Sequence, residues 1–206
     1  MANDPQTFDE LKVAVLSWSN RDDLDGNVAE FIALAERRLN RAIFVPDRES
    51  MATLTAAATV ALPSDFWGVR SIWLDTDPKV VLDQMNFGML QQAYAPAATG
   101  QPGNYAIHGS TLYLGPSPDS AYSVKLAYWA KVAALSVSNT TNWLLTAAPD
   151  IYIAASLVEL YLYIVDEAQA TLWEQRTAAK IAELNRDGSR RQYGGTPLRI
   201  RSPIVV

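Results

Sequence analysis

The chain of 206 residues contains no cysteine, which excludes disulfide bonds, thiolate zinc sites and a cysteine nucleophile. It has a single histidine, His108, and only 19% charged residues, below the roughly 25% of an ordinary soluble domain. No apolar run reaches the roughly 20 residues that cross a bilayer, because the most apolar stretch, Ile151 to Val165, is shorter and contains Glu159. The first residues lack the basic segment and apolar run of a signal peptide. We therefore expect a protein that is soluble and intracellular when made, with no membrane partner.

Hydrophobic residues make up 49% of the chain, and they include six tryptophans and nine tyrosines. Tryptophan and tyrosine are enriched where proteins contact one another. A lightly charged, aromatic-rich chain predicts either a large core or a surface that partners cover in part, and the two interpretations are compatible.

Charge is unevenly distributed along the chain. Residues 188–206 contain four arginines and no acid, for a net charge of +4. The other 187 residues carry 13 basic and 22 acidic side chains, for a net charge of −9. A basic end on an acidic body predicts a tail that binds a partner.

Helices are predicted in both terminal parts of the chain. A capping box at Thr7 to Glu10 begins the first helix, and Asn27 caps a second. A third, from Pro149 to Val165, is apolar on nearly every face and should be buried on several sides. A fourth runs from about Ala168 to Arg186 and ends at Asp187-Gly188, because glycine suits a left-handed cap. The inner face of the first helix consists of Phe8, Leu11, Val15 and Trp18.

Residues from about Ser50 to Val132 change to β-type patterns. The clearest strand, Tyr122 to Lys131, alternates apolar and polar side chains and predicts one buried and one open face. Two runs that flank His108-Gly109-Ser110 predict a tight hairpin, in which His108 tolerates an unusual backbone angle. Asn86 to Tyr94 predicts a short helix.

The predicted fold class is α+β. Helices from the N- and C-terminal parts form one α-helical bundle, with a β-rich insertion in the middle and an extended C-terminal tail. The expected boundaries are 1–49 and 134–188 for the bundle helices, 50–133 for the insertion and 189–206 for the tail.

No arrangement of residues for catalysis, metal binding or cofactor binding stands out. His108 lies in the predicted turn, and no pattern supplies it with a nucleophile and an orienting partner. Tyr193 to Pro197 contains glycine but lacks the strand and the Lys-Ser/Thr of a phosphate-binding loop. The paired carboxylates lie at turns or helix ends, where acids bond to local backbone: Asp22-Asp23, Asp75 with Asp77, and Asp166-Glu167. We therefore expect no catalytic residue, no metal site and no cofactor, and so no enzyme.

Several residues are candidates for a subunit interface. Arg37 and Arg41 lie one turn apart on the second helix. The overall net charge of −5 favours a solvated or subunit-contacting face over sequence-specific DNA binding. Trp143, Tyr152 and Tyr161 join them as possible interface residues.

The tail alternates arginine with apolar residues. In Leu198 to Arg201 a strand would place leucine and isoleucine on one face and both arginines on the other. Such a segment can pair with the edge of a partner's sheet or lie in a groove, and it orders as it binds. The alternative is a frayed terminus with isolated arginines. The residues expected to make the contact are Arg190, Arg191, Tyr193, Leu198, Arg199, Ile200, Arg201, Ile204, Val205 and Val206.

Four stretches of the chain, taken in order, carry a resemblance to a known family. They are Ala61 to Phe66, Asn104 to Pro116, Ser138 to Leu145 followed by Ala148-Pro149-Asp150, and an ending with Gly194-Gly195 and Leu198 to Arg201. In these stretches the chain resembles the tailed-bacteriophage head-to-tail adaptor (connector) proteins. The resemblance extends from the second helix to the tail, and none of its stretches is a catalytic signature.

The resemblance implies a structural virion protein of the neck between head and tail, assembled in the bacterial host cytoplasm. It implies a homo-oligomeric, dodecameric ring under the portal protein, with C-terminal arms on the portal and a lower face for the next neck or tail protein. Double-stranded DNA would pass through the lumen without sequence-specific binding, which repulsion by an acidic body favours. The ring would act after genome packaging, helping to retain the genome and completing the tail attachment site.

Two other functions stay open from the residues alone. Another neck or tail-completion (stopper) protein would have the same composition. A carbohydrate-binding or hydrolase module would use Trp67, Trp73 and Trp129 as a platform for sugars, although these residues fit core or edge positions of strands equally well.

Overall fold

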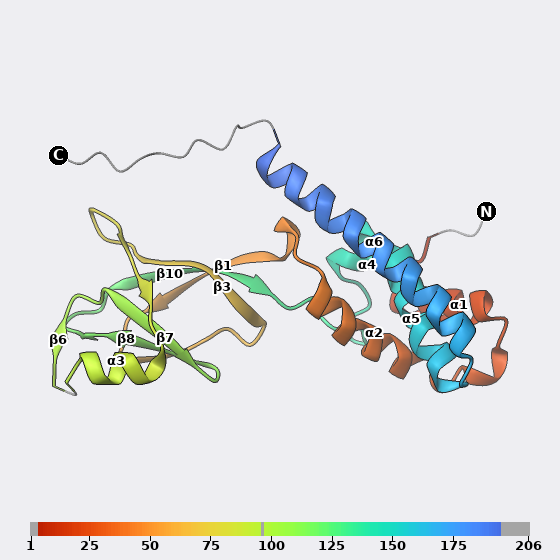
Figure 1. Cartoon of the computed structure of the whole chain (residues 1–206), viewed down its shortest axis with the longest axis horizontal. Helices are drawn as coiled ribbons and strands as arrows, with labels where there is room; N and C mark the ends of the chain where they lie inside the picture. The colour runs from red at the N-terminus through yellow and green to blue at the C-terminus, as the bar shows by residue number, and fades with distance from the viewer. Residues whose placement is uncertain (1–3, 96, 195–206) are drawn as a thin grey trace. The chain divides into compact units, whose positions relative to one another are not determined.

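The computed structural model describes residues 4–95 and 97–194, and in this range the chain is a mixed α+β protein (Figure 1). It divides into two compact units. Residues up to Asp47 and from Val132 onward form the helical unit, and Arg48–Lys131 form the β unit. Each unit has its own hydrophobic core.

The helical unit is built around one central helix, α5. Its helices are α1 (Phe8–Ser19), η1 (Asp22–Leu24), α2 (Val28–Ala42), α4 (Trp143–Ala147), α5 (Pro149–Tyr163) and α6 (Glu167–Tyr193). Helices α1, α2, α4 and α6 all contact α5, and every residue from Ile151 to Val158 is buried. The prediction that this apolar segment is buried on several sides is confirmed.

Local sequence explains where α1 begins and ends. The Thr7 hydroxyl accepts a hydrogen bond from the Glu10 N–H, as a capping box requires. In a capping box the Glu10 carboxylate would accept a hydrogen bond from the Thr7 N–H. Here it accepts one from the preceding Gln6 N–H, at 2.7 Å. Asn20 ends the helix in the left-handed region, with φ 53°, which asparagine tolerates better than most residues.

The β unit contains two four-stranded sheets whose inner side chains share one core. The first sheet has the order β1 (Glu49–Thr55), β10 (Ser123–Ala130), β3 (Phe66–Leu74), β4 (Val80–Val81). The second has the order β2 (Thr59–Ala61), β8 (Thr111–Gly115), β7 (Asn104–His108), β5 (Asp83–Gln84). The remaining short elements among the described residues are β6 (Thr99–Gly100), which pairs with β9 (Ser117–Pro118), and the helices η2 (Pro46–Arg48) and α3 (Phe87–Ala93).

Strand β10 alternates as predicted. Val124, Leu126 and Tyr128 are buried, and the residues between them are partly exposed. Strands β1 and β3 flank it, both antiparallel. The short helix predicted at Asn86 to Tyr94 is confirmed as α3, which the Asn86 side chain caps.

The predicted hairpin joins β7 to β8 through Gly109 and Ser110. The positive backbone angle belongs to Gly109, with φ 61°, so the prediction that His108 adopts an unusual angle is wrong. Glycine lacks a Cβ and takes the left-handed position at less cost. His108 is the last residue of β7, and its ring stacks on Phe87 with 4.9 Å between centroids.

The two ends of the β unit lie side by side. Glu49 of β1 is paired with Trp129 of β10. Next to this pair, the Arg48 guanidinium donates a hydrogen bond to the Ala130 carbonyl at 2.9 Å. The chain therefore enters and leaves the β unit at neighbouring positions.

Helix α6 is longer than predicted. It continues through Gly188 to Tyr193, so the expected end at Asp187-Gly188 is wrong. A side-chain Cβ at Gly188 would lie 2.8 Å from Val45, so the close approach requires glycine. The Asn185 side chain accepts a hydrogen bond from the Phe44 N–H at 2.8 Å. These tertiary contacts override the local stop signal and carry the helix onward.

Candidate interaction surfaces

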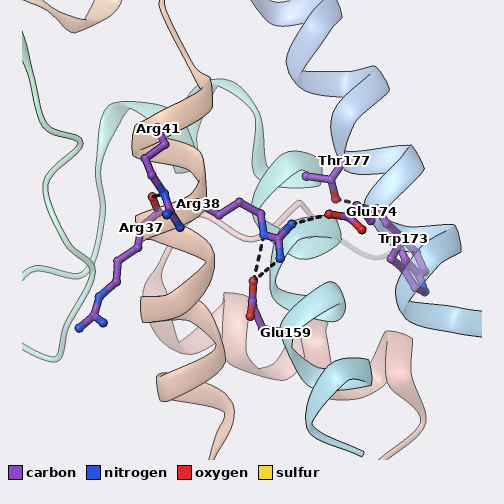
Figure 2. Close-up of polar contacts among 7 residues, drawn as sticks. All are labelled: Arg37, Arg38, Arg41, Glu159, Trp173, Glu174 and Thr177. Carbon is purple, nitrogen blue, oxygen red and sulfur yellow. Dashed lines mark hydrogen bonds and ion pairs between the residues drawn. The ribbon is translucent and has the colours of Figure 1, made fainter. Parts of the chain in front are cut away.

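Arg38 joins three helices of the helical unit (Figure 2). It projects from α2, and its guanidinium lies between Glu159 of α5, at 2.9 Å, and Glu174 of α6, at 2.8 Å. Burial alone would lower the pKa of Arg38, but the hydrogen bonds and charges of the two carboxylates outweigh it and raise that pKa. The ion pairs of Arg38 therefore hold α2, α5 and α6 together, and its guanidinium is already bound within the chain.

A second polar cluster fixes residues 132–142 on the helices. Glu36 of α2 is only 6% exposed, and its carboxylate accepts hydrogen bonds from the Leu135 N–H at 2.8 Å and the Tyr152 hydroxyl at 3.3 Å. Asn142 donates to the same hydroxyl at 2.7 Å. Burial raises the pKa of Glu36, although both hydrogen bonds oppose the rise. Burial and the nearby Glu36 carboxylate together raise the pKa of Tyr152.

This cluster removes Tyr152 from the expected subunit interface. Its side chain is fully buried and bonded inside the chain, so it presents no surface to a second subunit. The reason is the central position of α5, which turns nearly all of its faces inward. Trp143 and Tyr161, from the same expected set, are half-buried and pack against the edge of the helical core.

Arg37 extends from the side of α2 that faces away from Arg38 and Trp173, and the Arg41 side chain runs along the helix towards it (Figure 2). Both are exposed, and the Arg41 guanidinium donates to the Arg37 carbonyl at 3.1 Å. Among the ion pairs of the described part of the chain, none includes either arginine. Leu34, about one turn before Arg37, is 37% exposed. We term Leu34, Arg37 and Arg41 the arginine face.

A groove opens between α1, α5 and α6. It consists of a hollow of about 540 Å³ and an adjoining one of about 380 Å³, and Trp18, Asp150 and Ile153 line both. Trp18 is 58% exposed, although its ring meets Trp173 edge-on with 5.8 Å between centroids. Val13, in the larger hollow, is 67% exposed. We term the two hollows together the tryptophan groove.

The larger hollow of the tryptophan groove is acidic. Four carboxylates line it: those of Asp4, Asp9, Glu10 and Asp150. Two of them are paired with lysines, Asp9 with Lys12 and Asp150 with Lys180, so the four acids and two lysines have a net charge of −2. The smaller hollow has a cation of its own, because the Arg176 guanidinium lies over the Trp173 ring at 4.7 Å.

Most of the predicted docking tail falls outside the described residues, namely Leu198, Arg199, Ile200, Arg201, Ile204, Val205 and Val206. Arg190, Arg191 and Tyr193 form the last turns of α6 and are exposed. The expectation that these three are extended is therefore wrong. Arg191 pairs with Asp47 at 2.6 Å, which holds the end of the helix against the segment after α2.

Two of the three tryptophans considered as a sugar platform lie against arginine side chains. The Arg70 guanidinium lies over the Trp129 ring at 5.3 Å, and the Arg48 guanidinium lies over the Trp67 ring at 5.9 Å. Trp73 is half-buried. The arginines take up ring faces that a sugar would need, and no observation favours the carbohydrate alternative.

Sequence patterns missed the tryptophan groove and the role of Arg38. The periodicity of α1 places Trp18 on the same face as Phe8, Leu11 and Val15. Those three residues are buried, but Trp18, near the end of the helix, is exposed. Val13 is the signal that could have revealed the groove, because it is apolar and lies off the inner stripe. Nothing local distinguishes Arg38 from Arg37.

Comparison with known proteins gives one match over nearly the whole chain. The family model described as SU10 adaptor protein matches residues 6–201, a range that covers the β unit and most of the helical unit. No curated protein matches the chain. Across residues 4–95 and 97–194, no helix is long and apolar enough to cross a bilayer, and no group of three or more metal-binding side chains comes together.

Proposed function

The chain belongs to the SU10 adaptor protein family, a family of phage head-to-tail adaptors, and from this premise we propose that it forms a ring that joins the portal to the tail. A phage adaptor is a structural component of the virion, and the family points away from an enzyme. The observation that carries the proposal is the match over residues 6–201, because it includes the β unit, most of the helical unit and most of the basic tail.

In the proposed assembly, twelve copies form a ring beneath the portal, and residues 195–206 of each copy dock on the portal. The other side of the ring receives the next neck or tail protein, and the genome passes through the lumen. The acidic net charge outside the tail supports a conduit that repels DNA. The ring completes the tail attachment site once the genome is packaged.

Exposed apolar side chains of the helical unit support a role in assembly. Leu162, Tyr163 and Val165, where α5 gives way to α6, are 50%, 57% and 78% exposed. Val13 and Trp18 are exposed as well, and apolar side chains of this kind are available for a partner to cover.

The C-terminal tail, residues 195–206, can be removed without cutting into α6. Removing residues 195–206 should abolish docking on purified portal rings and leave the melting temperature nearly unchanged, because the cut leaves all of α6 in place. The cut belongs after Gly194, since a deletion from Ser189 would also remove the ion pair between Arg191 and Asp47. Co-sedimentation with portal rings and electron microscopy measure docking, and circular dichroism measures melting.

Two controls sharpen this test. Arg199→Ala with Arg201→Ala should weaken docking strongly, whereas Arg190→Ala in the last turns of α6 should not. An intact chain that ignores portal rings contradicts the proposed function. If the truncated chain still docks, only the role of the tail is contradicted. A stopper protein would instead bind a portal that already carries another ring and would ignore the bare portal.

A further inference from the structure

We propose that the arginine face of one copy binds the larger hollow of the tryptophan groove of the next copy. These two surfaces would then form the contact between neighbouring subunits. The inference rests on the proposed function, which supplies the second copy.

The charges of the two surfaces are opposite. Arg37 and Arg41 contribute +2 on one surface, and no ion pair of the described residues uses them. The larger hollow has a net charge of −2 after its two lysine pairs are counted. Arginine binds carboxylates through two parallel hydrogen bonds, so the pairing would fix the geometry of the contact as well as attract the copies.

The apolar parts of the two surfaces also fit one another. Leu34 gives the arginine face an apolar end, and Val13 and Trp18 form an apolar floor beside the acids of the hollow. Specific interfaces combine an apolar centre with a charged rim. Tryptophan and arginine are the residues most often found to dominate their binding energy. Trp18, the exposed ring shared by both hollows, would lie at the centre.

The two surfaces lie on different sides of the same helical unit. Figure 2 shows Arg37 pointing away from the side of α2 where Arg38 reaches Glu174 and Trp173 lies, and Arg41 running along the helix to the Arg37 carbonyl. Trp173 in turn lines the tryptophan groove. One copy therefore offers each surface to a different neighbour. A head-to-tail contact of this kind generates a ring when its rotation closes, and it does not stop at a two-fold dimer.

Cross-linking tests the contact directly. The chain has no cysteine, so Val13→Cys and Leu34→Cys introduce the only thiols, both at exposed positions. With a short bis-maleimide linker, a chain that carries both cysteines should give a ladder of covalent oligomers, and a mixture of the two single variants should give heterodimers. Each single variant alone should give only background dimers. Efficient dimers of one single variant, or links from Val13→Cys to the portal protein, would overturn the proposal.

Charge reversal tests the same contact without a linker. Arg37→Glu with Arg41→Glu should abolish ring formation, and so should Asp4→Arg with Asp9→Arg. A mixture of the two variants should restore rings of alternating copies, because both types of contact then join opposite charges. Arg186→Glu, on the exposed side of α6, is the matched control and should assemble normally.

The outcomes separate this inference from the proposed function. Sedimentation and electron microscopy report rings whichever surfaces form them. If an intact chain forms no ring either alone or on portal rings, the proposed function fails. If rings persist in both charge-reversed variants, the ring stands and only this pairing of surfaces is contradicted.

Discussion

Arg37 and Arg38 are adjacent in the sequence but lie in opposite environments. Successive residues of a helix differ by about 100° in direction, so Arg38 turns towards α5 and α6 while Arg37 turns outward. The same geometry buries Glu36, which hydrogen bonds with Leu135 and Tyr152 make tolerable. Three consecutive charged residues thus perform three different tasks.

Substitution of Arg38 should separate these tasks. Arg38→Ala leaves Glu159, which is mostly buried, without its cation, and we expect the free energy of unfolding to fall by roughly 1–3 kcal/mol. Arg37→Ala is the matched control, and it should change that free energy by about 0.5 kcal/mol or less. Urea titrations followed by tryptophan fluorescence measure both. Equal losses for the two variants would contradict the assignment.

Glu36 should make stability depend on pH. Because its folded pKa is raised, the folded state binds this proton more tightly than the unfolded state. The associated stability is fully present below the ordinary value of 4.5 and is lost as pH rises through the raised folded pKa. Glu36→Gln keeps an acceptor for the Leu135 N–H and removes the titration. Between pH 4.5 and the raised folded pKa, the free energy of unfolding should therefore fall less for Glu36→Gln than for the unaltered chain. The difference between the two slopes should be at most about 1.4 kcal/mol for each pH unit. Parallel curves in urea titrations at several pH values would show that Glu36 does not titrate in this way.

Elements with a strong local pattern were predictable, and those that depend on distant partners were not. The apolar α5, the alternating β10 and the Gly109 hairpin follow from nearest neighbours in sequence. Strands β5, β6 and β9 have two residues each and exist only because a distant strand pairs with them. The end of α6 was missed for the same reason, since Val45 and Phe44 decide it and lie more than a hundred residues away.

Gly188 provides a test at this scale. In an exposed helix, glycine to alanine stabilises by about 1 kcal/mol. Here the new Cβ would lie 2.8 Å from Val45, whose branched side chain has little freedom to move, so overpacking of about 1–3 kcal/mol should win. Gly188→Ala should therefore lower the melting temperature, and adding Val45→Ala should recover part of the loss. Ser189→Ala, one residue further and exposed, should have little effect. A more stable Gly188→Ala variant would contradict the close packing.

The whole molecule consists of two units with separate cores, and the sequence indicates this through a change of hydrophobic period. The candidate surfaces were harder to predict. Arg37 and Arg41 stand out in the sequence as exposed cations, whereas the tryptophan groove is assembled from α1, α5 and α6 and has no sequence signature of its own. Tyr152 was predicted at an interface but lies in the core. The sequence alone does not distinguish these two positions for an aromatic residue in a helix.

The separation into units predicts that the helical unit folds alone. Glu49 and Trp129 are paired across two strands, so a short glycine-serine linker can replace residues 49–129 without stretching the chain. The shortened protein should keep its helical circular dichroism and melt in one cooperative transition, because the helical core draws no residue from the β unit. Loss of the helical signal would show that the helices depend on the β unit.

The neighbouring ends of the β unit also have a mechanical consequence. Tension applied between residues 47 and 132 would act on one end of the β1–β10 ladder. The hydrogen bonds between these strands would then break one after another, and not all together as they do under shear. Unfolding of the β unit under such tension would therefore begin at the pair of Glu49 with Trp129 and proceed towards the pair of Thr55 with Ser123.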